Sequence, residues 1–65
     1  MNATYRFYIH SMTDIYVTDD YSTAYSIALD MADRDNSFIL FYDSVKGICI
    51  HHIDELIAYH ENMMI

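Results

Sequence analysis

The chain of 65 residues has ten acidic and three basic residues, a formal net charge of −7 and a hydrophobic content of 54%. This length predicts a single domain, residues 1–65, and the hydrophobic content excludes the disordered class. Cys49 is the only cysteine, which excludes an intrachain disulfide and favours a cytoplasmic, reducing location. No signal-like segment opens the chain and no apolar run approaches about 18 residues, so we expect neither secretion nor a membrane partner.

Two short alternating segments predict a β-hairpin over residues 4–18. Residues 4–10, TYRFYIH, and residues 15–18, IYVT, place similar side chains at every second position, which is typical of strands. The segment between them lacks the Asn-Gly or Asp-Gly pair that would fix the geometry of the turn.

The next segment, residues 19–36, changes to a helical period. Its apolar positions follow the spacing i, i+3, i+4 and i+7: Ala24, Ile27, Ala28 and Met31. Asp19 and Asp20 precede this stripe, where carboxylates satisfy the free N–H groups of a first helical turn. Asp30 and Arg34 lie four residues apart on the expected outer face. These features predict an amphipathic helix.

A second hairpin follows the helix. Residues 37–43, SFILFYD, read as an apolar strand with Phe38, Leu40 and Tyr42 on one side and Ile39 and Phe41 on the other. The turn DSVKG includes Gly47, the only glycine, which can take a positive φ. Residues 48–50, ICI, then lead back as the fourth strand.

Two interpretations remain open for the last element. A helix is favoured by the helical spacing of Ile53, Leu56, Ile57, His60 and Met64. Alternatively, one helical turn at 53–56 leads into a fifth strand, since short segments are ambiguous. The predicted fold is α+β, an antiparallel sheet of four strands (ββαββα, or ββαβββ) with helix packed on one face.

The alternation also predicts which side chains lie beneath the helices. The expected covered face contains Tyr5, Phe7, Ile9, Ile15 and Val17, with Phe38 or Ile39 and Ile48 or Ile50. The second face then holds Tyr8 and Tyr16, with Arg6 and Thr4 nearby. Tyrosine is enriched at protein contacts, although it also suits an exposed strand. Because a chain this small without a disulfide benefits from a partner, this face is a candidate interface.

Residues 49–60, CIHHIDELIAYH, gather candidates for metal or thiol chemistry. On a strand, Cys49 and His51 share one face while His52 points the opposite way. They offer two ligands where a structural zinc site needs four, and no Cys-x-x-Cys or His-Glu-x-x-His spacing occurs. An acidic chain also disfavours a reactive thiolate. We therefore predict no catalytic residue, metal site or cofactor, and not an enzyme.

The acidic residues favour a different kind of site. Eight of the ten are aspartates, and they are spread over predicted turns and helix exteriors. Such a chain repels nucleic acid, so direct nucleic acid binding is not expected. Carboxylates held on a rigid fold can instead compete for a groove lined with Lys and Arg. The candidate partner-binding residues are Asp19, Asp20, Asp30, Asp33 and Asp35, with Tyr8 and Tyr16 as apolar anchors.

In size, cysteine content and richness in Asp and Tyr, the chain resembles small bacteriophage-encoded inhibitors, including anti-CRISPR proteins. The resemblance implies a protein that occludes the basic, nucleic-acid-binding surface of a host enzyme or defence complex, in the host cytoplasm. One alternative is a homodimeric structural or regulatory protein that uses the Tyr8 and Tyr16 face. A less favoured alternative is a metal-binding protein that uses Cys49, His51 and His52.

Overall fold

The computed structural model describes residues 5–34 and 38–63 and confirms the order ββαββα. The elements are β1 (Phe7–His10), β2 (Ile15–Thr18), α1 (Tyr21–Arg34), β3 (Phe38–Asp43), β4 (Ile48–His52) and α2 (Ile53–Met63). The last element is a helix, so the alternative ββαβββ is wrong. Met64 and the predicted helix end at 35–36 lie outside the described residues.

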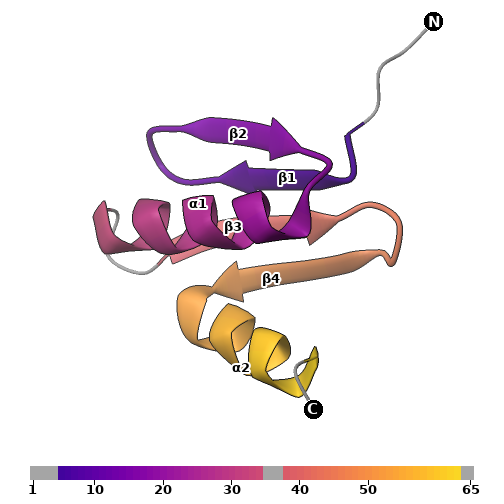
Figure 1. The fold of residues 1–65 in the computed structure, drawn as a ribbon. Coiled ribbons are helices and arrows are strands. Elements are labelled where there is room, and N and C mark those ends of the chain that lie inside the picture. The colour runs from indigo at the N-terminus through magenta and orange to yellow at the C-terminus, as the bar shows by residue number, and fades with distance from the viewer. Residues whose placement is uncertain (1–4, 35–37, 64–65) are drawn as a thin grey trace, which may run out of the picture.

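The strands form one antiparallel sheet in the order β2-β1-β3-β4. Each hairpin supplies two neighbouring strands, and the hairpins join where β1 pairs with β3. Helix α1 connects them, crossing in front of the sheet at β1 and β3, while α2 lies next to β4 (Figure 1). None of the helices in the described residues is long and apolar enough to cross a membrane.

The core lies between the sheet and the two helices. From the sheet it takes Phe7, Ile9, Ile39, Phe41 and Ile50, and from the helices Ala24, Ala28, Met31, Ala32, Ile53 and Leu56. The predicted stripe of α1 is thus buried, except that Ile27 is only half-buried at its edge. The small alanines let α1 approach the sheet closely, and the aromatic rings of Phe7 and Phe41 fill the space beneath it with their centroids 5.7 Å apart.

The predicted cap at the start of α1 and the predicted glycine turn between β3 and β4 are both present. The side chain of Asp20 accepts a hydrogen bond from the backbone N–H of Thr23 at 2.8 Å, which is the geometry of a helix N-cap. Gly47 has a φ of 68° and its N–H donates to the carbonyl of Asp43 at 2.8 Å. A side chain at position 47 would strain this turn.

The register of the first hairpin overturns the predicted faces of β2. Tyr16 pairs with Ile9, while Ile15 and Val17 pair with His10 and Tyr8. Because paired residues share a face, Tyr16 lies on the helix side, and Ile15 and Val17 lie on the uncovered side. The expectation that Tyr8 and Tyr16 share one face is therefore wrong.

Two further expectations at the start of the sheet are wrong. Tyr5 is 41% exposed rather than buried beneath the helices. Arg6 leaves the second face and reaches Asp43, whose partner across the sheet is the buried Phe7. Thr4 lies outside the described residues. In the third strand, the open choice is settled in favour of Ile39 and Phe41 as the buried set.

Candidate functional site

The predicted acidic residues at the start of α1 are exposed but fixed by hydrogen bonds. Asp19 Oδ1 accepts the backbone N–H of Arg6 at 2.9 Å. Asp20 Oδ2 accepts both the backbone N–H of Thr23 and its hydroxyl, the latter at 2.7 Å. The hydroxyl and then the backbone of Thr23 hold the pKa of Asp20 below its usual value. The carboxylate of Asp20 therefore stays ionised near neutral pH, and hydrogen bonds hold both side chains in position.

The acidic residues near the end of α1 lie on its outer face. Asp30 and Asp33 are exposed there, one helical turn apart. Arg34 contacts Asp30 and, from the β1–β2 turn, Asp14, each at 3.2 Å. The predicted pair of Asp30 and Arg34 is thus confirmed. Asp35 lies outside the described residues.

These carboxylates form what we call the acidic helix face: Asp14, Asp19, Asp20, Asp30 and Asp33. The face runs along α1, whose 14 residues span about 20 Å at about 1.5 Å per residue. Arg34 offsets part of its charge near the C-terminal end. The carboxylates therefore gather at the two ends of α1: Asp19 and Asp20 at its start, and Asp14, Asp30 and Asp33 toward its end.

The opposite side of the molecule is the open sheet face. We define it by the strand residues that the register turns away from the helices: Tyr8, His10, Ile15, Val17, Leu40, Tyr42, Cys49 and His51. None of these is Asp, Glu, Lys or Arg. The rings of Tyr8 and Tyr42, paired across β1 and β3, lie with their centroids 6.1 Å apart. A sheet face turned to solvent is normally polar, and this one is aromatic, aliphatic and imidazole-bearing.

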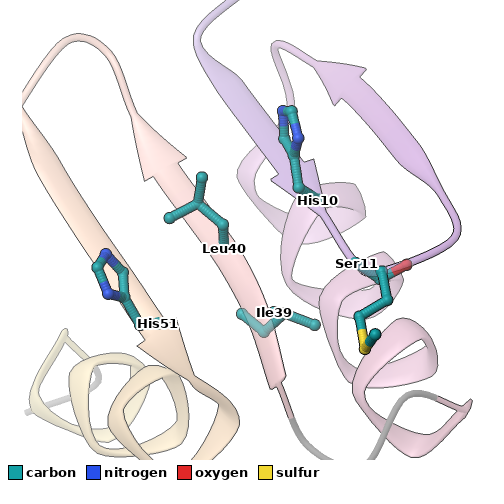
Figure 2. A pocket seen from close by; sticks show the side chains of 6 residues that line it. His10, Ser11, Ile39, Leu40 and His51 are labelled. Atoms are coloured by element: carbon teal, nitrogen blue, oxygen red, sulfur yellow. The ribbon is translucent and has the colours of Figure 1, made fainter.

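A shallow hollow opens at one end of this face. It has a volume of about 230 Å³ and is lined by His10, Ser11, Met12, Ile39, Leu40 and His51. Figure 2 shows the side chains of His10, Leu40 and His51, which come from three neighbouring strands. Met12, 85% exposed, stands beside the hollow. The open sheet face therefore has an apolar recess, with an exposed apolar side chain from the β1–β2 turn at its rim.

Cys49 and His51 lie together on the open sheet face, as predicted. The Sγ atom of Cys49 is 3.3 Å from Nε2 of His51. His52 points the other way, and its Nδ1 accepts the backbone N–H of Asp54 at 3.1 Å. Across residues 5–34 and 38–63, no group of three or more His, Cys, Asp or Glu side chains converges as a metal site would require.

A half-buried ion pair between Arg6 and Asp43 was not predicted from the sequence. Asp43, 1% exposed, accepts hydrogen bonds from Nε and Nη2 of Arg6, each at 3.0 Å. Its Oδ1 also accepts the backbone N–H groups of Val45 and Lys46. Arg6, foremost by its hydrogen bonds, lowers the pKa of Asp43 against the opposing effect of burial. The sequence separates the two partners by 37 residues, so no local spacing could have revealed the pair.

An aromatic stack joins the two helices and was also missed. The ring of His60 stacks on Tyr25 with centroids 4.0 Å apart, and its Nδ1 is 2.8 Å from the hydroxyl of Tyr21. Partial burial raises the pKa of the Tyr21 hydroxyl, so it stays protonated near neutral pH. The sequence did indicate that His60 lies on the same side of α2 as its buried residues, because it follows their helical spacing. The stack fixes α2 against α1.

Comparison with protein-family models, with curated proteins and with solved structures gave no match to this chain. The assignment of a function therefore depends on the two surfaces described above: the acidic helix face and the open sheet face.

Proposed function

We propose that this chain is a small acidic protein-binding module that occludes a basic, nucleic-acid-binding surface of a partner protein. The observation that carries the proposal is the placement of exposed carboxylates at both ends of α1, while none of the strand residues that form the open sheet face is acidic. A groove built to hold phosphates is lined with Lys and Arg, and such a groove binds fixed carboxylates by the same charge-assisted hydrogen bonds.

The number of carboxylates along α1 can be compared with the number of phosphates that they would replace in the partner's groove. Over about 20 Å, one strand of duplex DNA presents about six phosphates, at one per 3.4 Å. The acidic helix face offers five carboxylates over a similar length, and Arg34 neutralises part of them. Charge alone therefore gives weaker binding than nucleic acid, and neutral contacts beside the helix must contribute.

Tyr16 is the tyrosine placed to make such a contact. It is 40% exposed, on the helix side of the edge strand β2, against which α1 packs. A half-exposed tyrosine on this side of the sheet is a suitable anchor, because it buries large apolar area with little loss of side-chain entropy. Tyr8 lies on the other side of the sheet and is not part of this contact.

The resemblance to phage-encoded inhibitors supports a host enzyme or defence complex as the partner. We therefore expect the immobilised chain to capture a nucleic-acid-binding protein from nuclease-treated bacterial lysate, and a competing oligonucleotide to release it. The affinity should fall steeply as the salt concentration rises, because the proposed contacts join exposed carboxylates of this chain to exposed Lys and Arg side chains of the partner. Capture that is insensitive to salt, or a partner that binds the chain and the oligonucleotide together, would contradict the proposal.

A matched pair of double variants locates the contact. Asp30→Lys with Asp33→Lys should weaken capture at least ~10-fold, because it places repulsive charge opposite the basic groove. Asp54→Lys with Glu61→Lys changes the net charge equally, but on the exposed side of α2, and should leave capture nearly unchanged. Quantitative pull-down at one salt concentration gives the comparison. Equal losses in both double variants would show that only net charge matters and would remove α1 as the contact.

A further inference from the structure

We propose that the open sheet face binds a second copy of this chain, as a weak symmetric dimer. The inference does not rest on the partner proposed for the acidic helix face. It rests on the distribution of charge over the two sides of the sheet.

The open sheet face is the region where two such chains can meet without repulsion. Each copy has a formal net charge of −7, so contacts that bring the acidic helix faces together are electrostatically costly. The eight residues of the open sheet face carry no carboxylate and no Lys or Arg. A basic partner would gain its attraction over α1 rather than here. A second copy is the partner whose charge this neutral face suits.

The shape of the face also fits a contact with itself. A twofold dimer uses the same patch on both copies, so the patch must hold both a projection and a recess. Ile15, 69% exposed, projects from the edge strand β2, and the hollow spans the next three strands, between His10, Leu40 and His51. Face-to-face packing would bring the Tyr8 and Tyr42 pair into the desolvated centre, where tyrosine contributes most.

The size of the face predicts weak association. Four strands about 4.8 Å apart, each with four residues at about 3.3 Å, cover about 20 by 13 Å. That is well below the roughly 800 Å² per partner of a standard interface. We therefore expect a dissociation constant in the range of ~10 μM to ~1 mM.

Sedimentation equilibrium over that concentration range, in the presence of a reductant, tests the proposal. The dimer fraction should rise between ~50 mM and ~500 mM salt, because salt screens the repulsion between the two acidic chains. This is the opposite of the salt effect expected for the acidic helix face, so each proposal can fail without the other. A chain that stays monomeric at both salt concentrations, or a dimer that dissociates as salt is added, would overturn the inference.

Two exposed aliphatic residues provide a matched pair of variants. Ile15→Asp places a carboxylate on the open sheet face, whereas Val45→Asp places one in the β3–β4 turn, and the side chains are similarly exposed at 69% and 71%. Ile15→Asp should raise the dissociation constant at least ~10-fold and Val45→Asp less than ~3-fold. A second open-face variant, Cys49→Asp, should act like Ile15→Asp. Equal effects of Ile15→Asp and Val45→Asp, with circular dichroism showing both folded, would contradict a contact through this face.

Discussion

Asp43→Ala is expected to lower the free energy of unfolding by about 1–3 kcal/mol, because it removes a buried acceptor that several hydrogen bonds share. The same change removes the acceptor of the Val45 and Lys46 N–H groups. A single core in a chain below ~70 residues supplies only about 3–5 kcal/mol, so this variant should lose a large part of its stability. Urea denaturation followed by circular dichroism measures the loss.

Two control variants separate the roles of Asp43. Asp43→Asn keeps an oxygen for the turn N–H groups but loses the charge, so its loss should be smaller than that of the alanine variant. Asp33→Ala removes one exposed negative charge from α1 and should change the unfolding free energy by less than about 0.5 kcal/mol. If Asp43→Ala were as stable as Asp33→Ala, the ion pair would have no role in holding the second hairpin to β1.

The ion pair of Arg6 and Asp43 also predicts how the free energy of unfolding depends on pH in acid. The pKa of Asp43 is lower in the folded chain than its unfolded value of about 3.9. Its contribution is therefore fully present above that unfolded pKa and is lost as the pH falls through the folded pKa. The difference in unfolding free energy between the natural chain and Asp43→Asn should thus be constant near neutral pH and shrink in acid. A difference that grows in acid would contradict the direction of the shift.

Phe41→Ala is expected to unfold the chain, with a loss of about 3–5 kcal/mol for a fully buried phenylalanine in the core. Phe41 is 0% exposed and contacts the rings of Phe7 and Tyr21 from beneath α1. Its neighbour Tyr42 is also aromatic but lies half-buried on the open sheet face. The Tyr42→Ala variant should therefore stay folded.

The comparison of these two variants tests the assignment of the faces. It is best made by urea denaturation at low micromolar concentration, where self-association through the open sheet face is absent. Equal losses for Phe41→Ala and Tyr42→Ala would mean that both faces of β3 are buried in solution. A larger loss for Tyr42→Ala would reverse the face assignment.

The elements could be predicted because their signals are local. The stripe through Ala24, Ala28 and Met31, the cap at Asp20 and the turn at Gly47 each depend on neighbours within a few residues. They gave the helix, both hairpins and the α+β class. Helix α2 was harder to predict, because a short apolar segment suits a helix or a strand equally well. In the structure this segment is a helix that packs against β4 and α1.

The faces of β2 were predicted wrongly for a physical reason. Because side chains alternate with a period of two, a register shifted by one residue reverses every side chain of a strand. Here the register depends on the turn at 11–14, where Ser11 Oγ accepts the N–H groups of Thr13 and Asp14. The preference of Ile15 and Val17 for burial did not determine which side of β2 faces the helices, because β2 is an edge strand and both of its sides are partly exposed.

The candidate site was predicted only in part. Exposure of Asp30 and Asp33 followed from the helical period, and the shared face of Cys49 and His51 followed from the strand period. The neutral character of the open sheet face did not follow, because it depends on which side of each strand the helices cover. Nor did the sequence show that Arg6, one of only three basic residues, is held by Asp43.

The measurement that tests the account most directly is a map of where a cationic probe binds. An oligo-arginine peptide would be titrated at low salt into the isotope-labelled chain, with amide chemical shifts recorded by NMR. We expect shift changes along α1 around Asp30 and Asp33 and none at Tyr8, Tyr42 or Cys49, and we expect the changes to disappear as salt is added. Shift changes centred on the open sheet face, or changes that persist at high salt, would contradict this prediction.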